Sequence, residues 1–469
     1  MSDIKLYIKN LLIRRQIIIA ENRANLFEEF VTNENNCVSV QQIFDIQNKL
    51  MANWELNNRI ADIQQQPVSI PNGTVGKPYE AMIDFAKLGW GDIAEYELEG
   101  LDGPELNFDK QTNTITGVPT QSGDLKITFR FRVNDEPEDS PLNEKQIPLI
   151  INPNPKSLWK NIDSDRTDKF WKEDNVAAID ALGNKHIVVA SKRGRSHATV
   201  GSFRDDDFAY KHYDKTGWSI VVVADGAGSA KFSREGSRLA CKAIIDYFDE
   251  NFTPESLAEF DETLLHHKNG TGEDIPKKLS HFTYNNLSKA SYSAHLKLTE
   301  AANVTGSNLK DFHSTLIFTL FKKYEFGYAF LSFGVGDCPI AILNKSLSEV
   351  TLMNWLDVGD FGGGTRFITM PEIFTADNFS TRFKFKLMDD FEYLVLMTDG
   401  IYDPKFVVEA NLEKADKWKE FINDLQGNNE ENSKVELDAG NKEIANQLSA
   451  WMDFWSAGNH DDRTLAIVF

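Results

Sequence analysis

The stretch Trp218-Ser-Ile-Val-Val-Val-Ala224-Asp225-Gly226-Ala227-Gly228-Ser229 decides the fold of this 469-residue chain. Residues 218–224 are almost continuously apolar, which is typical of a strand buried on both faces. The strand stops at Asp225, and a helix with apolar residues near 239–244 begins soon after the glycines. An aspartate at such a strand end faces a cleft. Glycines beside it allow the backbone and a metal ion to approach each other without a Cβ between them.

The same construction recurs along the chain. Residues 392–398 predict a strand that ends at Asp399, with Asp403 four residues later. In a third case the order is reversed, because Asp461 comes just before a strand, the terminal one at residues 464–469. Residues 204–208 add a fourth acidic cluster, residues 313–315 open one strand, and Asp337 closes another. Hard divalent cations prefer oxygen ligands, and two of them can share and activate a water. Separated aspartates at strand ends are what such a site requires.

The order of these motifs over residues 185–469 resembles the metal-dependent protein phosphatase 2C family, and the first metal loop, residues 225–236, is most similar to its bacterial branch. The resemblance implies an α/β (α+β layered) domain, built as an antiparallel β-sandwich flanked by helices. It also implies hydrolysis of phosphoserine or phosphothreonine by water activated between two Mn²⁺ or Mg²⁺ ions. A phosphorylated protein would be the substrate, and a cognate Ser/Thr kinase is a partner expected from the family.

The resemblance also assigns roles to individual residues, all of them by position in the family's motifs. Asp206 would bind one ion, Asp225 would bridge both ions, and the Gly226 carbonyl would be a further ligand. Asp399 and Asp461 would complete the other site, and together these four aspartates are the catalytic set. Asp337 and Asp403 lie where family members hold a third, weaker ion. In the triple aspartate we favour Asp206 over Asp205 and Asp207. Residues 359–365 are similar to the flap near the substrate.

The chain departs from the family at two positions. Animal members place an arginine for substrate phosphate five residues before the metal aspartate, and that position is Gly201 here. Arg204, Arg195 or His197 are the candidates to replace it. The histidine that follows the Asp-Gly pair in animal members is Ala227 here, as in bacterial relatives, so proton delivery to the leaving oxygen is expected to depend on water at the metals.

The part of the chain before residue 156 has a different organisation. Residues 1–64 predict a helical N-terminal segment, because apolar residues recur at spacings of three and four, with a capping box expected at Ser39 and Gln42. Residues 66–154 show a period of two, clearest in residues 126–133, with turn signals between short strands. This region resembles bacterial immunoglobulin-like modules and predicts an all-β domain that binds a protein partner or acts as a spacer. Residues 156–469 are then the catalytic domain.

Composition limits the classes of function. Lys and Arg total 50 against 71 Asp and Glu, and a net charge of −21 argues against general binding to nucleic acid or to anionic membranes. The apolar patches of residues 4–20 are interrupted by basic residues, so we expect neither a signal peptide nor a membrane span. Three dispersed cysteines suit a reducing cytoplasm. None is followed six positions later by arginine, which excludes a cysteine-dependent phosphatase.

Two alternatives to a protein phosphatase stay open. The missing arginine motivates a phosphatase-shaped adaptor with weak or no activity, whose immunoglobulin-like module binds a partner. The retained aspartates oppose this alternative, because an idle site need not keep carboxylates that repel one another. The second alternative is a metal-dependent esterase that acts on small phosphorylated molecules.

Overall fold

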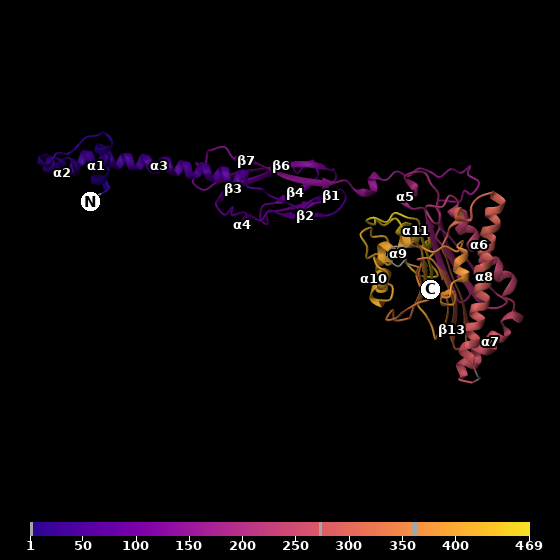
Figure 1. The fold of residues 1–469 in the computed structure, drawn as a ribbon. Coiled ribbons are helices and arrows are strands. Elements are labelled where there is room, and N and C mark those ends of the chain that lie inside the picture. Colours follow the sequence, from indigo (N-terminus) through magenta and orange to yellow (C-terminus); the bar gives the residue numbers. More distant parts are fainter. Residues whose placement is uncertain (1–2, 272–273, 358–363) are drawn as a thin grey trace. The chain divides into compact units, whose positions relative to one another are not determined.

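The computed structural model describes residues 3–271, 274–357 and 364–469, and the chain divides into two compact units, Met1–Leu158 and Trp159–Phe469 (Figure 1). Each unit has its own hydrophobic core, and each is described by itself. The three-part division at residues 64–66 and 154–156 stays a prediction. Within the described residues, no helix combines the length and hydrophobicity that crossing a membrane requires.

The first unit begins with helices. They are α1 (Asp3–Arg14), η1 (Glu21–Arg23), α2 (Ala24–Thr32) and α3 (Glu34–Gln65). The helical prediction for this segment is therefore confirmed. The capping box expected at Ser39 is wrong, because α3 starts five residues earlier, where the Asn33 side chain accepts hydrogen bonds from the backbone N–H groups of Asn35 and Asn36. Ser39 instead donates to the Asn35 carbonyl inside the helix.

Two small sheets and a short helix follow in the same unit. The first sheet has the order β1 (Gly73–Thr74), β7 (Asn143–Asn152), β6 (Gly123–Val133) and β3 (Ile93–Glu99), and the second has the order β2 (Tyr79–Met82), β5 (Thr114–Gly117) and β4 (Leu106–Asp109), with α4 at Phe85–Leu88. The predicted alternation in residues 126–133 is confirmed, since Ile127, Phe129, Phe131 and Val133 are all buried. The immunoglobulin-like assignment stays a prediction.

The second unit contains two larger antiparallel sheets. The five-stranded sheet has the order β10 (Asp207–Tyr213), β11 (Trp218–Ala224), β12 (Leu316–Tyr324), β13 (Gly327–Val335) and β16 (Phe383–Met388). The six-stranded sheet has the order β15 (Val350–Leu352), β14 (Ile340–Leu343), β17 (Tyr393–Met397), β18 (Arg463–Val468), β9 (Lys185–Lys192) and β8 (Asn175–Leu182). The sheets share an apolar core, in which Val221 and Val223 of one sheet meet Val189 of the other.

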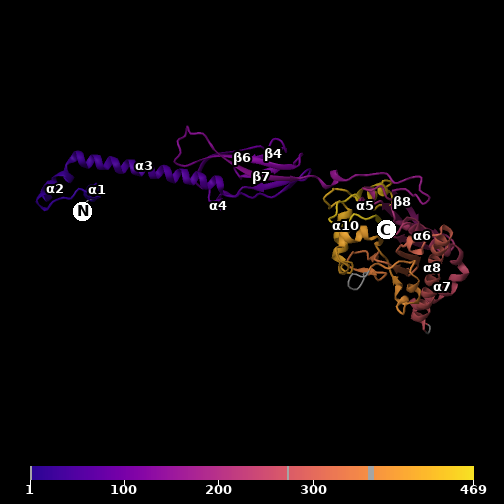
Figure 2. The ribbon, with the colours of Figure 1, turned by 45° about the horizontal axis from the view of Figure 1, so that its top comes forward.

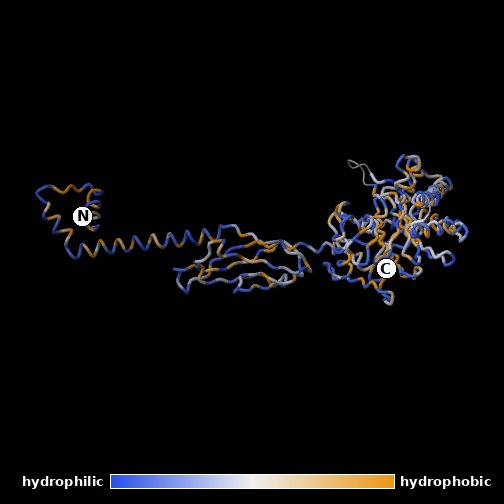
Figure 3. Tube along the Cα trace, turned by 90° about the horizontal axis from the view of Figure 1, so that it is seen from below, coloured by the Kyte–Doolittle hydropathy of each residue, from blue (hydrophilic) through white to orange (hydrophobic). Residues whose placement is uncertain are grey.

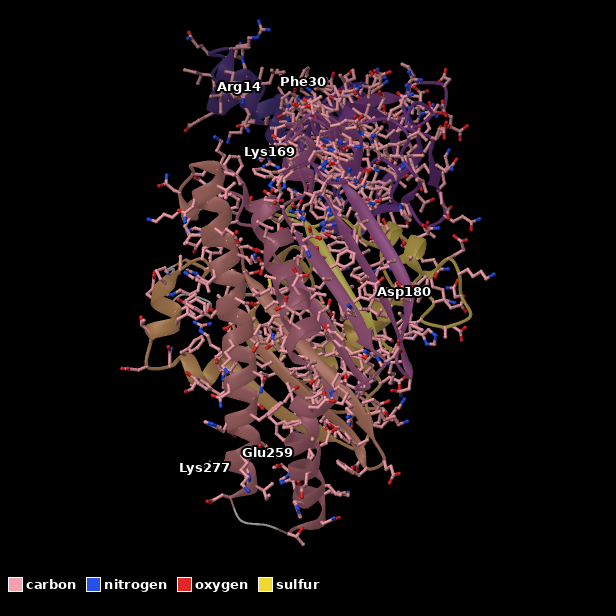
Figure 4. The ribbon with its side chains drawn as sticks, turned by 90° about the vertical axis from the view of Figure 1, so that its right-hand side faces the viewer. Arg14, Phe30, Lys169, Asp180, Glu259 and Lys277 are labelled. Carbon is pink, nitrogen blue, oxygen red and sulfur yellow. The ribbon has the colours of Figure 1, made fainter. Side chains whose placement is uncertain are left out.

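Helices cover the outer face of each sheet. The five-stranded sheet packs against α6 (Ser233–Asn251), α7 (Pro254–Asn269) and α8 (Ile275–Thr305), and the six-stranded sheet against α9 (Asp399–Phe406), α10 (Ala415–Leu425) and α11 (Ile444–Trp451). Figure 4 shows α7 and α8 side by side, with Glu259 and Lys277 labelled on them. The alternate residues Ile220 and Val222 of β11 face these helices. Strand β11 is therefore buried on both faces, and the mixed α/β prediction is confirmed.

Short helices complete the second unit and the connection to it. They are η2 (Pro155–Leu158), α5 (Arg195–Ala198), η3 (Leu309–Phe312), η5 (Pro371–Thr375), η6 (Phe379–Arg382) and η7 (Glu409–Asn411). Figure 2 shows α5 and β8 in another view of this unit, and residues of both elements line one cavity. Of these helices, α5 and η3 lie beside the acidic loops described below.

The close contact between α6 and η3 leads to a stability prediction. A Cβ on Gly236, in the first turn of α6, would stand 2.3 Å from the carbonyl oxygen of Phe312. Gly236→Ala should therefore lower the free energy of unfolding of the second unit by about 1–3 kcal/mol, because α6 must move away. Lys242→Ala on the same helix removes an exposed ion pair with Asp246 and should cost below about 0.5 kcal/mol. Urea denaturation measures both, and equal effects would contradict this packing.

Candidate metal centre

Strand register brings the acidic loops to one edge of the second unit. Asp207 at the start of β10 pairs with Ala224 at the end of β11, so the loops that hold Asp206 and Asp225 are neighbours. Met397 at the end of β17 pairs with Leu465 near the start of β18, which places Asp399 close to Asp461. Residues separated by as many as 255 positions in the sequence thus meet, because each stands at the same edge of paired antiparallel strands.

The six carboxylates of the predicted set interact electrostatically. Burial raises the pKa of Asp225 well above its usual range, and the charges of Asp399, Asp206, Asp461 and Asp337 raise it further. Burial also raises the pKa of Asp399, and the charges of Asp461, Asp337 and Asp403 raise it further. Carboxylates that raise one another's pKa in this way lie close together and are poorly solvated. The structure therefore brings all the predicted aspartates into one cluster.

The three consecutive aspartates have three different surroundings. Asp206 points into the cluster, where Thr398 and Thr464 donate to its Oδ2 at 2.8 and 2.7 Å. Burial, followed by the charge of Asp462, raises the pKa of Asp206 to about 7.

The neighbours of Asp206 point away from the cluster. Asp207 forms an ion pair with buried Lys172 at 3.0 Å. Burial opposes its ionisation, yet the charge of Lys172 holds the pKa of Asp207 below its usual range. The carboxylate of Asp205 lies 3.9 Å from the Nε2 of His197. Asp207 begins β10, whereas Asp205 and Asp206 lie in the loop before this strand.

Residues 313–315 hold the Asp225 loop in place. The backbone N–H of Asp225 donates to Thr315 Oγ1 at 2.9 Å, and the Asp225 carbonyl accepts from the Thr315 N–H at 2.8 Å and the Ser314 hydroxyl at 3.0 Å. A Cβ on Gly226 would stand 2.5 Å from the carbonyl oxygen of Asp205. Only glycine therefore permits this approach of the two acidic loops.

Asp399 and Asp403 share helix α9. Asp399 occupies its first turn, where the helix N-terminus favours negative charge, and Asp403 follows one turn later on the same side. Asp337 reaches the cluster from the end of β13, and its ligand atoms lie within 4.8 Å of those of Asp225 and Cys338. Thr365 donates to Asp337 Oδ2 at 2.8 Å, whereas Oδ1 is buried without a hydrogen-bond partner among the described residues.

Asp462 joins three backbone segments, a role that the sequence analysis missed. Its Oδ1 accepts from the Gly194 N–H at 2.5 Å and from His197 Nδ1 at 3.0 Å, and its Oδ2 accepts from the Asp205 N–H. Burial lowers the pKa of His197, but the hydrogen bond and charge of Asp462 outweigh it and raise the pKa to about 9. Asp461 and Asp206 are each one residue from this junction. The junction therefore determines the backbone position of both.

All three candidates for holding phosphate already have protein partners. Arg204 is buried and donates to the Glu173 and Asp206 carbonyls and to Ser191. His197 is engaged with Asp462. Arg195 is more exposed, with its guanidinium over the Trp159 ring at 4.6 Å and an ion pair to Asp453 at 2.9 Å. Of the predicted flap, residues 359–363 lie outside the described residues.

A cleft of about 590 Å³ opens beside the cluster. Its walls include Asp403 and Asp461 from the cluster, together with Ser196 and His460. The Nδ1 of His460 is buried without a hydrogen-bond partner among the described residues. No sequence pattern marked Ser196 or His460, because each reaches the cleft only through the packing of α5 onto the loop before β18. Chemically, the arrangement is an oxygen-rich site for divalent cations that opens to solvent.

The junction at Asp462 leads to a prediction. Asp462→Ala would leave the buried N–H groups of Gly194 and Asp205 without acceptors and should lower the free energy of unfolding by at least about 2 kcal/mol. Asp462→Asn keeps one acceptor oxygen but turns its NH2 group towards the other backbone N–H, so it should recover only part of this loss. Chemical denaturation of the metal-free protein measures both variants, and a loss below about 1 kcal/mol in Asp462→Ala would show that these hydrogen bonds do not hold the segments together.

Several known proteins are similar to part of this chain. No curated protein matches the chain. One similar solved structure is a bacterial serine phosphatase, with 16% identity, a TM-score of 0.35, and coverage of 60% of this chain and 96% of that chain. A second is the catalytic domain of the serine/threonine protein phosphatase PstP in complex with two manganese ions, with 14% identity, a TM-score of 0.36, and coverage of 60% and 96% of the two chains. A third is the S. agalactiae serine/threonine phosphatase, with 14% identity, a TM-score of 0.36, and coverage of 61% and 99%. The family model described as protein phosphatase 2C matches residues 193–453, more than half of the sequence. The chain therefore belongs to the protein phosphatase 2C family.

Proposed function

We propose that the chain is a metal-dependent protein serine/threonine phosphatase that hydrolyses phosphoserine and phosphothreonine. The observation that carries the proposal is the buried cluster of Asp206, Asp225, Asp399 and Asp461, in which burial raises the pKa of all four and the charge of Asp461 raises the pKa of the other three. Such a cluster is costly unless cations bind it. Because the chain belongs to the protein phosphatase 2C family, phosphate monoester hydrolysis is the reaction that we assign to this cluster.

The residues fit a pair of Mn²⁺ or Mg²⁺ ions. The Oδ1 of Asp337 is buried without a hydrogen-bond partner among the described residues, and the ligand atoms of the set are almost entirely oxygen. We assign Asp206, Asp225 and the Gly226 carbonyl to one ion and Asp225, Asp399 and Asp461 to the other. Asp337 and Asp403 would hold a third ion. When bound, such ions activate a water for attack and neutralise the charge of the phosphate.

The protein's own contribution is to orient these ligands. Thr398 and Thr464 hold the carboxylate of Asp206 in one orientation through its Oδ2. Thr315 holds the backbone of Asp225 on both its N–H and carbonyl sides. Preorganised ligands of this kind hold their geometry without rearranging when substrate arrives. In the cleft, Ser196 and His460 are positioned to contact the substrate beside the cluster.

The two alternatives make different demands on the same site. An adaptor with a silent site is favoured by one feature, the glycine at position 201, where animal members have the arginine that binds substrate phosphate. Arg195 is a candidate to bind the phosphate in its place. An esterase for small molecules would use the same cluster. A phosphorylated protein is the substrate class that we propose, with a cognate kinase as the enzyme that supplies it.

Replacement of the bridging carboxylate tests the site. Asp225→Asn should lower the turnover number by at least about a hundredfold, because one of the assigned ligands of both ions loses its charge. The metal-free variant should unfold at the same or a higher temperature, since a repelled buried charge is removed. Asp214→Asn is the matched control, because the Asp214 side chain is 99% exposed. Unchanged turnover in Asp225→Asn would refute the assignment.

Metal removal and substrate choice separate the three functions. Treatment with EDTA should abolish phosphate release from a phosphothreonine peptide, and Mn²⁺ should restore it. Hydrolysis of the peptide at a kcat/KM at least about tenfold above that of a nucleotide supports the protein phosphatase. The reverse preference would indicate the small-molecule esterase. Absence of release from either substrate, with Mn²⁺ binding shown by calorimetry, would indicate the adaptor.

A further inference from the structure

The middle of α3 is exposed to solvent on all sides within the described part of the first unit. All residues from 45 to 55 are exposed, which is about three turns. Before them, Val40 and Phe44 belong to a small cluster with α1 and α2. After them, Leu56, Ile60 and Ile63 pack against the sheets. Figures 1 and 2 show no other element of this unit beside the middle of α3.

This bare stretch carries an apolar stripe made of Ile46, Leu50 and Trp54, with Met51 beside it. The three stripe residues recur every four positions, and their exposed fractions are 68%, 67% and 65%. Of the 27 exposed large hydrophobic residues in the described part of the chain, 12 lie in residues 3–65. Figure 3 shows that hydrophobic residues recur along this helical segment. An apolar stripe along one helix face marks an interaction surface for another helix.

The helices around the stripe lack a core of their own. Only Ile8, Val31 and Val40 are buried among α1, α2 and the start of α3. Helices with so few buried side chains are marginal in water and are usually stabilised by association. Ile43 is half-buried and extends the stripe towards this cluster, so one partner helix would cover both.

The charge distribution indicates what the partner is. Residues 1–65 contain seven Lys and Arg against eight Asp and Glu and are nearly neutral, although the whole chain has a net charge of −21. The stripe is flanked by uncharged residues. They are Gln42, Gln47, Asn53 and Asn57. Asp45, Lys49 and Glu55 lie off this face, since a helix turns about 100° per residue. Two copies of this acidic chain can therefore meet here without the repulsion that opposes contact elsewhere.

We propose that two copies of the chain form a dimer through the middle of α3. A two-fold axis at Leu50 places this side chain against its own copy, and the stripe is then self-complementary, as an isologous interface requires. Spacings of three and four between Ile43, Ile46, Leu50 and Trp54 suit side-by-side packing of two helices. The proposal concerns the first unit and does not depend on the chemistry proposed for the second.

The mass of the full chain in solution tests the proposal. Light scattering coupled to gel filtration should give twice the chain mass of 53.1 kDa for the wild type. Leu50→Glu places a charge in the stripe and should weaken dimerisation at least about tenfold, giving the mass of one chain. Asn48→Glu adds the same charge to the opposite side of α3 and should stay dimeric. Circular dichroism and the thermal midpoint verify that both variants are folded.

Two outcomes would overturn the proposal. A wild-type mass of one chain would point to a helix of another protein as the occupant of the stripe. A dimer that Leu50→Glu and Asn48→Glu leave equally intact would place the interface elsewhere.

Discussion

Mutual repulsion between buried carboxylates is the constraint on which the second unit depends. Burial and the charge of Asp399 raise the pKa of Asp225, burial and the charge of Asp461 raise the pKa of Asp399, and Asp206 and Asp337 add to both effects. A fold that collects such charges must hold each one against repulsion until a cation offsets it. The two sheets supply this resistance, because their shared apolar core fixes the strand ends from which the acids project.

Polar junctions at the strand ends transmit that rigidity to the site. Asp462 binds the backbone of Gly194 and of Asp205, and Thr398 and Thr464 bind the carboxylate of Asp206. These contacts join β9, β10, β17 and β18 at one edge. Asp462 is thus as much a part of the site's architecture as Asp461. Its role differs, because it accepts hydrogen bonds from backbone N–H groups.

The two units solve different physical problems. The second unit buries large sheets between helices and has a core adequate for a rigid site. The first unit combines a sheet core around Trp90 and Phe129 with helices that leave much of their apolar surface exposed. The proposed catalysis and the proposed association therefore concern different units, and the long helix α3 is the element that connects the small helical cluster to the sheets of its unit.

The sequence alone determined the helical start and the alternation in residues 126–133, because these depend on local periodicity, whereas the mixed α/β class was implied by the family resemblance of the ordered motifs. It also located the acidic loops, since an aspartate after an apolar strand is visible in a linear pattern. Tertiary structure decided which of Asp205, Asp206 and Asp207 faces the cluster, because strand pairing and the Lys172 ion pair separate them. It likewise decided the roles of Asp462, His197 and Arg204. Their partners lie far away in the sequence, so no local pattern could reveal them.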